Sequence, residues 1–221
     1  NIFSTLNLCK IARFSKVEQL ILISSDKAVR PSSLMGATKR ISELIIGAFV
    51  LDMKKHSYND LLPTRFSSVR FGNVLGSSGS VVKIFQKQIN DGGPLTITHP
   101  EVIRYFMTIS EAAELVIQSA FLSKGEGEVF LLDMGEPIKI KRLAEQMIFL
   151  SGLKIKNKNK NNNGNIEIIY TGLKPGEKLK EELLIGGSSD STKHPLIYKT
   201  NEKCLPYDFV MNKLKEMEKY I

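Results

Sequence analysis

Ser25, Asp26 and Lys27 stand side by side in the chain and together could exchange protons with a bound substrate. They directly follow residues 20–23, a short run of leucine and isoleucine that is typical of a buried strand. Strands of open α/β sheets present their chemistry at the carboxyl end, where the ligand crevice lies. The hydroxyl, carboxylate and amine of this turn are therefore predicted to lie at a functional site.

A helix that carries a lysine is predicted to begin shortly after this turn. Pro31 prevents an immediate helix start, and Ser32 or Ser33 can cap a helix that begins just beyond them. Met35 and Lys39 are one turn apart on that helix, so they share a face. The lysine amine is expected beside the reactive turn, whereas the methionine thioether cannot serve as a base.

Three later stretches combine residue types that suit a phosphorylated ligand. Asn73 lies between two glycines, which let backbone N–H groups approach an anion closely. The planar fork of Arg104 can make two parallel charge-assisted hydrogen bonds to a diphosphate. Lys174 and Glu177 flank a Pro-Gly turn that would suit an anionic sugar nucleotide. Each stretch also has a purely structural alternative: a turn asparagine, a surface arginine and a charged exposed turn.

Composition limits the class of protein. The 221 residues are 42% hydrophobic and 24% charged, as in an ordinary globular protein. No apolar run approaches the roughly 20 residues that a membrane-spanning helix needs. The net charge of +8 comes largely from lysines in residues 154–160 and near the carboxyl terminus, without a nucleic-acid-binding motif. Cys9 and Cys204 lack metal or redox spacing, which favours free thiols in a reducing compartment.

The order of these motifs resembles a known family. The Ser-Ser-Asp-Lys strand end, followed by Met-Gly-Ala-Thr-Lys-Arg, is similar to the nucleotide-sugar 4,6-dehydratases of the extended short-chain dehydrogenase superfamily. The resemblance is closest to the large, often membrane-anchored branch used in capsule and glycan biosynthesis. It covers about residues 1–185 and includes the Arg-Phe-Gly-Asn-Val-Leu-Gly, Arg-Tyr-Phe-Met-Thr and Gly-Leu-Lys-Pro-Gly-Glu-Lys runs. In the superfamily a tyrosine usually stands where this chain has Met35, and in the large branch the Asp-Lys pair takes over its acid–base work.

The resemblance implies an α/β fold, namely the carboxyl-terminal half of a Rossmann-like extended short-chain dehydrogenase with a small α+β substrate-binding part. The expected divisions are a dinucleotide-binding remainder, a UDP-sugar-binding part, and a final loop and helix, over residues 1–75, 76–185 and 186–221. No Gly-x-Gly-x-x-Gly unit occurs, so we expect that the chain lacks the amino-terminal half of the fold. Expected helices cover residues 1–15, 34–55, 81–90, 139–152 and 208–221, and a further helix is capped by Ser110 and runs to about residue 121. Expected strands cover residues 18–24, 63–71, 95–98, 128–133 and 166–170, of which residues 95–98 form an exposed strand.

The resemblance also implies site residues. The implied catalytic residues are Ser25, Asp26, Lys27, Met35 and Lys39. The residues implied at an NAD cofactor are Ser24, Lys39, Arg70 and Phe71. The residues implied at a UDP-sugar substrate, with the backbone edge of strand 95–98 at the uracil, are Asn73, Ser80, Val81, Thr96, Ile97, Thr98, Arg104, Lys174 and Glu177. No metal site is expected.

The implied activity is the NAD-dependent dehydration of UDP-N-acetylglucosamine to a UDP-4-keto-6-deoxy hexosamine, in bacterial polysaccharide biosynthesis. Asp26 would act on the C4 hydroxyl and on the departing O6, and Lys27 would remove the C5 proton. Two alternatives stay open: a truncated, non-catalytic UDP-sugar-binding fragment, and a UDP-sugar 4-epimerase, against which Met35 and the Asp-Lys pair count. We expect a homo-oligomer in the cytoplasm, at the inner membrane face if the whole protein has an anchor. This segment itself is expected to contact neither membrane nor nucleic acid.

Overall fold

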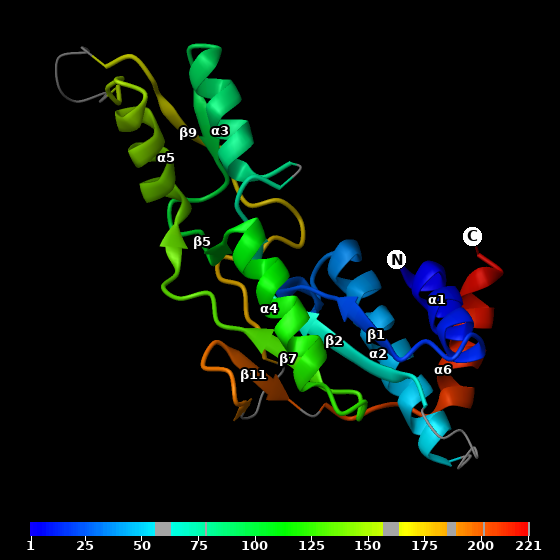
Figure 1. Ribbon diagram of the computed structural model, residues 1–221. Coiled ribbons are helices and arrows are strands. Elements are labelled where there is room, and N and C mark those ends of the chain that lie inside the picture. Colours follow the sequence, from blue (N-terminus) through cyan, green and yellow to red (C-terminus); the bar gives the residue numbers. More distant parts are fainter. Residues whose placement is uncertain (56–62, 78, 157–163, 185–188, 201, 221) are drawn as a thin grey trace. The chain divides into compact units, whose positions relative to one another are not determined.

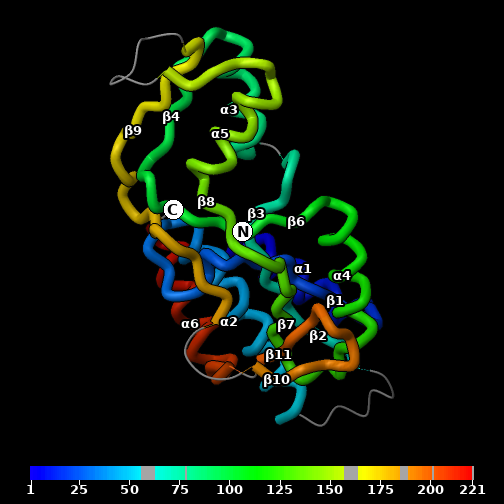
Figure 2. Tube along the Cα trace, turned by 90° about the vertical axis from the view of Figure 1, so that its left-hand side faces the viewer, coloured from blue at the N-terminus to red at the C-terminus, as the bar shows by residue number. Residues whose placement is uncertain are grey.

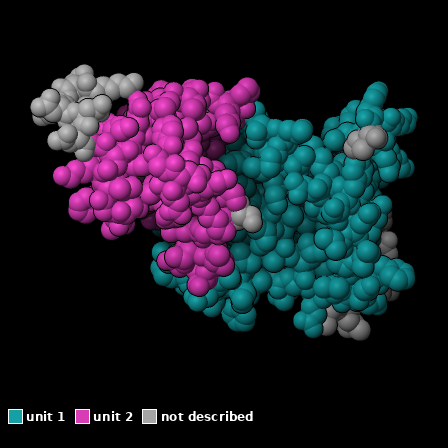
Figure 3. Space-filling model, turned by 90° about the horizontal axis from the view of Figure 1, so that it is seen from above, with its two compact units in different colours: residues 1–71, 113–133, 182–221 teal, residues 72–112, 134–181 magenta. Residues whose placement is uncertain are grey.

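A computed structural model describes residues 1–55, 63–77, 79–156, 164–184, 189–200 and 202–220. The chain forms two compact units (Figure 3). The first unit comprises residues 1–71, 113–133 and 182–221, and the second comprises residues 72–112 and 134–181. All residues expected to be catalytic or to contact NAD belong to the first unit, and all expected UDP-sugar ligands belong to the second. Of the lysine-rich stretch, residues 157–163 lie outside the described residues.

The first unit is built on a five-stranded sheet in the order β1-β2-β7-β11-β10. The three parallel strands are β1 (Gln19–Ile23), β2 (Arg65–Arg70) and β7 (Val129–Leu132). The strands β11 (Ile197–Thr200) and β10 (Asp190–Ser191) continue the sheet in antiparallel pairing. The expected α/β fold with a parallel sheet is confirmed.

The register of the parallel strands determines where a site can form. Gln19 pairs with Arg65 and Ile23 with Val69, so β1 and β2 end at the same level. Residues that follow Ile23 and residues that follow Arg70 therefore emerge at one edge of the sheet. This is the carboxyl edge, where α/β sheets present their ligand sites.

Three helices form a core together with β2. They are α1 (Ile2–Phe14), α2 (Leu34–Lys55) and α6 (Tyr207–Glu218), and α1 lies beside α6 in Figure 1. The buried residues of this core include Leu6 of α1, Phe49 of α2, Phe66 of β2 and Leu214 of α6. The helix before β7 is α4 (Ile109–Leu122). Because α2 and β2 share this core, the start of α2 is held near the carboxyl edge of the sheet.

The second unit packs two helices against short strands. The helices are α3 (Val81–Asn90) and α5 (Ile140–Leu150). The strand pairs are β3 (Asn73–Val74) with β6 (Phe106–Met107), β4 (Leu95–Ile97) with β9 (Ile168–Tyr170), and β5 (Ile103–Arg104) with β8 (Ile138–Lys139). Figure 2 shows β4 and β9 side by side. The core of the second unit contains apolar side chains from both helices and from β4, including Phe85, Ile89, Leu95 and Ile148.

Local sequence patterns predicted most elements well. The helices α2 and α3 have the predicted bounds, and Ser33 caps α2 by accepting a hydrogen bond from the Gly36 N–H at 3.2 Å. Two expectations are wrong. Residues after 184 were expected to form no strand, yet β11 pairs with β7 and buries Ile197 completely. The strand expected to be exposed has Leu95 and Ile97 in the core of the second unit, 0% and 2% exposed, and only Thr96 faces outward.

The cap of α4 also differs from the prediction. The helix begins at Ile109, so Ser110 lies inside it, and Thr108 caps it. The Thr108 hydroxyl accepts from the Glu111 N–H at 3.2 Å, while the Glu111 carboxylate accepts from the Thr108 N–H at 2.7 Å. This reciprocal arrangement is a capping box. The hydrogen bonds from the Thr108 backbone and hydroxyl hold the pKa of Glu111 below its ordinary value.

Substitutions of Thr108 and Ser110 test which of the two residues caps α4. Thr108→Ala is expected to lower the free energy of unfolding by about 1 kcal/mol, because it removes one half of the box. Ser110→Ala is expected to leave stability unchanged or slightly raised, since Ser110 is exposed within the helix. Urea denaturation of both variants checks this, and a larger loss from Ser110→Ala would contradict the assignment.

Candidate active site

The predicted reactive turn lies at the carboxyl edge of the sheet. The Ser24 N–H donates to the Val69 carbonyl at 2.7 Å, and the Asp26 N–H donates to the Phe71 carbonyl at 3.1 Å. The turn continues as a short 3-10 helix, Asp26–Ala28, which Ser25 caps by accepting from the Lys27 N–H at 3.3 Å. The end of β2 therefore holds the turn from one side, and the turn caps itself.

Asp26 combines burial with an unused acceptor. The residue is 1% exposed. Its Oδ1 accepts from the Ser25 hydroxyl at 2.7 Å and pairs with the Lys27 ammonium at 2.9 Å. Its Oδ2 is buried and has no hydrogen-bond partner among the residues that the structure describes. A buried polar atom without a partner is costly, so Oδ2 is suited to receive a hydrogen bond from a ligand hydroxyl.

The start of α2 brings Lys39 to the same edge. The Lys39 ammonium donates to the Ile23 carbonyl, the last of β1, at 2.8 Å. An ammonium has three N–H donors, so others remain for a ligand. Met35, one turn earlier, is 45% exposed. The structure thus groups the five residues expected to be catalytic around the end of β1.

Gly36 allows α2 to approach the turn closely. A Cβ at this position would lie 2.2 Å from the Lys27 carbonyl oxygen and 3.3 Å from the Pro31 Cβ. The first distance is too short for a contact with backbone, so either the helix or the turn would have to move.

Gly36→Ala is therefore expected to destabilise the protein by about 1–3 kcal/mol, the usual cost of overpacking. In an open helix the same change would stabilise it by up to about 1 kcal/mol. Urea denaturation measures the difference, with Ser110→Ala as a helix substitution that meets no neighbour. An unchanged or higher stability of Gly36→Ala would show that α2 does not press on the turn.

The side chain of Arg70 is 0% exposed, so its guanidinium does not face a ligand site. Glu43 of α2 accepts from its Nε and Nη2, both at 2.7 Å. Glu202 accepts from its Nη1 at 2.6 Å and from its Nη2 at 3.0 Å. Burial acts to lower the pKa of Arg70, but the hydrogen bonds and charges of Glu43 and Glu202 outweigh it and hold that pKa above its ordinary value.

The other residues expected at NAD have related contacts. The Ser24 hydroxyl donates to Glu43 at 2.6 Å, and Phe71 anchors Asp26 through its carbonyl. Of the four residues expected at the cofactor, Lys39 has ammonium N–H donors left for a ligand after its bond to Ile23. The contacts of all four residues with NAD stay predictions. The sequence analysis missed Glu43 and Glu202. A lone carboxylate within the apolar run 41–48 was an available signal for Glu43.

In the second unit, three expected substrate ligands donate hydrogen bonds to the carboxylate of a fourth, Glu177. Glu177 accepts from the Thr98 hydroxyl at 2.7 Å and from Arg104 Nη2 at 3.4 Å. Its other oxygen accepts from the Lys174 N–H at 3.1 Å. Arg104 also donates to the Leu179 carbonyl at 3.2 Å and is 7% exposed. These hydrogen bonds fix the guanidinium in place, and its contact with a diphosphate stays a prediction.

The remaining expected ligands lie elsewhere in the second unit. Asn73 Oδ1 and Ser80 Oγ are buried without a hydrogen-bond partner among the described residues, and Val81 begins α3. Thr96 donates its N–H to the Gln88 side chain at 3.1 Å and accepts from it at 2.8 Å. The side chain of Ile97 is buried, and its carbonyl accepts from the Thr171 N–H at 2.9 Å.

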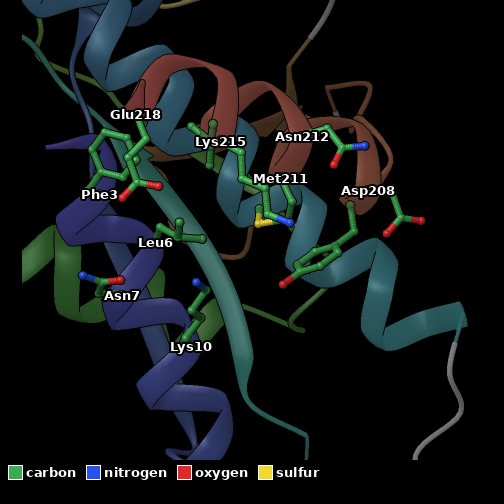
Figure 4. A pocket seen from close by; sticks show the side chains of 11 residues that line it. Phe3, Leu6, Asn7, Lys10, Asp208, Met211, Asn212, Lys215 and Glu218 are labelled. Atoms are coloured by element: carbon green, nitrogen blue, oxygen red, sulfur yellow. The ribbon is translucent and has the colours of Figure 1, made fainter. Parts of the chain in front are cut away.

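Two hollows lie on the first unit, and neither is lined by a residue expected in the site. One, of about 460 Å³, runs between α1 and α6 with Phe3, Leu6 and Met211 in it (Figure 4). Its rim carries both signs of charge, with Lys10 and Asp208 among them. The other, of about 530 Å³, lies near the start of β7. Within the described residues, no three His, Cys, Asp or Glu side chains are placed to hold a metal ion, and no helix is long and apolar enough to cross a membrane.

The chain is similar in sequence to known proteins. The family described as "Polysaccharide biosynthesis protein" matches residues 1–202. The capsular polysaccharide biosynthesis protein CapD of Staphylococcus aureus is 50% identical over 184 residues, which are 83% of this chain and 28% of CapD. The chain therefore spans much less than half of that relative.

Solved structures share the fold. The structure of Pen from Bacillus thuringiensis has a TM-score of 0.72 and 30% identity, and the match covers 98% of this chain and 68% of Pen. DesIV from Streptomyces venezuelae, a dTDP-glucose 4,6-dehydratase solved with NAD bound, has a TM-score of 0.64. At 16% identity, over 83% of this chain and 56% of DesIV, that likeness concerns the fold alone.

Proposed function

Because the chain belongs to the polysaccharide biosynthesis protein family, we propose that it carries the catalytic and UDP-sugar-binding part of a nucleotide-sugar 4,6-dehydratase. The substrate is UDP-N-acetylglucosamine, the cofactor is NAD, and the product is a UDP-4-keto-6-deoxy hexosamine. The similarity to CapD supports a role in making polysaccharide precursors.

The observation that carries the proposal is the state of Asp26. One of its oxygens is engaged by Ser25 and Lys27, and the other is buried and unpaired among the described residues. This is an acid–base group with a position reserved for a substrate hydroxyl. Met35 stands where the superfamily has a tyrosine, and its thioether cannot exchange protons. The acid–base chemistry is therefore assigned to Asp26 and Lys27 in the turn.

Lys39 is the residue that fits the nicotinamide end of NAD, because its ammonium is held at the end of β1 with N–H donors to spare for ribose hydroxyls. The chemistry that bound NAD supplies is the acceptance and return of a hydride. The chain's own residues manage the protons. This division of labour is typical of cofactor enzymes.

Asp26 Oδ2 takes the proton of the C4 hydroxyl as C4 becomes a ketone. Lys27, whose side chain is 28% exposed, gives one ammonium proton to solvent and so becomes a neutral amine. The neutral Lys27 amine removes the C5 proton, which the C4 ketone has made acidic. Asp26 then gives its proton to O6, which leaves as water. When C6 has received the returning hydride, the Lys27 ammonium gives a proton back to C5. Ser25 keeps the carboxylate oriented through its hydrogen bond to Oδ1.

The direct test incubates the protein with UDP-N-acetylglucosamine and NAD, follows the 4-keto product, and measures UDP and NAD binding by calorimetry. The proposal predicts product. A C4-inverted UDP-sugar as the product would instead identify a 4-epimerase. UDP binding without NAD binding and without product would identify a non-catalytic UDP-sugar-binding fragment.

A further inference from the structure

A ring of hydrogen bonds encloses the end of β1. The Ser24 hydroxyl donates to Glu43 Oε1 at 2.6 Å, and the same oxygen accepts from Arg70 Nε at 2.7 Å. The backbone closes the ring, because the Ser24 N–H bonds to Val69 and the Asp26 N–H bonds to Phe71, the two neighbours of Arg70. A shift of Arg70 or Glu43 would therefore move the residues that carry the acid–base turn.

Glu202 holds this ring from outside. It follows β11 along the chain, 132 residues from Arg70, and binds both Nη atoms of that guanidinium. Its side chain is 14% exposed. Arg40 of α2 contacts both carboxylates, at 3.0 Å from Glu43 and at hydrogen-bonding distance from Glu202.

The charges of this cluster balance. Two guanidinium groups face two carboxylates, so each member is neutralised by its neighbours. Loss of one carboxylate charge would leave an excess positive charge in a buried place, which is strongly unfavourable unless the remaining groups rearrange. The remaining carboxylate, Glu43, is the group that also holds Ser24. A rearrangement would thus be transmitted to the turn.

We infer that Glu202 is a positioning residue: through Arg70 and Glu43 it fixes the Ser24–Lys27 segment in the geometry that catalysis needs. The inference rests on the proposed function for its catalytic consequence, but not for its structural one. It assigns a role at the site to the segment after residue 184, in which the sequence showed no chemistry. Glu202 itself touches no reacting atom in this account.

The test compares Glu202→Gln with Asp52→Asn. Glutamine keeps the size and one acceptor oxygen but removes the charge. Asp52 of α2 forms an ion pair of 2.7 Å with Arg13 of α1 and is 13% exposed, close to the 14% of Glu202. Its substitution is therefore a matched loss of charge outside the ring. Glu202→Asp, which retains the charge, serves as the conservative variant and keeps the test usable if Glu202→Gln folds poorly.

Amide hydrogen exchange gives a readout that is independent of turnover. In Glu202→Gln, the Ser24 and Asp26 amides are expected to exchange at least about tenfold faster relative to the Ser68 amide, which bonds to Glu128 in the same sheet. Asp52→Asn should leave that ratio unchanged, and Glu202→Asp should lie near the unmodified protein. Equal acceleration of all three amides would mean general loss of stability and would overturn the inference.

Kinetics in the complete enzyme tests the catalytic consequence. Glu202→Gln is expected to lower kcat about tenfold or more with little change in KM, since misplacing reacting groups costs rate rather than binding. Faster exchange with an undiminished kcat would overturn the claim that this positioning serves catalysis. If the unmodified enzyme makes no dehydrated product, the proposed function fails, whereas selective exchange at Ser24 and Asp26 would still support the positioning.

Discussion

Replacing Asp26 with asparagine is expected to lower kcat for UDP-N-acetylglucosamine by about a hundred- to ten-thousand-fold, the usual contribution of a general acid–base group. Asparagine has nearly the same shape, but it can neither take the C4 hydroxyl proton nor protonate O6. Lys27→Ala should cause a loss of similar size, because it removes the base for C5. Steady-state kinetics of both variants in the complete enzyme measures these effects.

The binding of UDP serves as the internal control for this prediction. The expected ligands of the nucleotide, including Arg104 and Glu177, belong to the second unit and are untouched by the substitutions. Calorimetry should therefore give UDP affinities close to that of the unmodified enzyme. Asp52→Asn removes a carboxylate that forms an ion pair with Arg13, and this variant should retain the UDP affinity and the kcat of the unmodified enzyme. Near-normal rates in Asp26→Asn or Lys27→Ala would refute the assigned roles.

The second large effect concerns stability. Arg70→Met is expected to lower the free energy of unfolding by about 3–5 kcal/mol, because it removes the buried cation of the cluster and leaves Arg40 to balance both Glu43 and Glu202. Arg13→Met breaks an ion pair whose arginine is 27% exposed and should cost no more than about 1 kcal/mol. Urea denaturation at neutral pH measures the loss of stability in both variants. Equal losses would mean that the Arg70 cluster stabilises the protein no more than the Arg13 ion pair does.

The pH dependence of this difference has a definite sign. Burial acts to raise the pKa of Glu202, but the hydrogen bonds and charges of Arg70 and Arg40 outweigh it and hold that pKa below its ordinary value. A carboxyl with a lowered pKa contributes stability above its unfolded pKa and loses that contribution as the pH falls through its folded value. The difference in free energy of unfolding between the unmodified protein and Arg70→Met should therefore become smaller as the pH falls below the ordinary pKa of a glutamate. A gap that widens in acid would contradict the account.

The features that the sequence predicted well are those decided by neighbours along the chain. The bounds of α2 follow from its apolar periodicity and from the Ser33 cap, and the turn at Asp26 follows from a run of leucine and isoleucine that ends in polar residues. The cap of α4 was equally local. Thr108 and Glu111 have the spacing of a capping box, and Ser110 was preferred only because it is a good capping residue in isolation.

The features that could not be predicted depend on residues far apart in the chain. Glu43 lies 27 residues from Arg70, and Glu202 lies 132 residues from it, so nothing local indicated that they share one guanidinium. A buried arginine in a strand reads in sequence as a ligand for phosphate as readily as a structural cation. The pairing of β11 with β7 is of the same kind, because its partner strand is distant in sequence.

The most direct test of the account follows the reaction of UDP-N-acetylglucosamine and NAD in D₂O by mass spectrometry and NMR. Because the C5 proton passes to a side chain that exchanges with solvent, the account predicts a product that has lost one water and carries one solvent deuterium at C5. Asp26→Asn and Lys27→Ala should form none of it. A product of unchanged mass that is inverted at C4 and contains no solvent deuterium would contradict the dehydratase account and identify epimerisation instead.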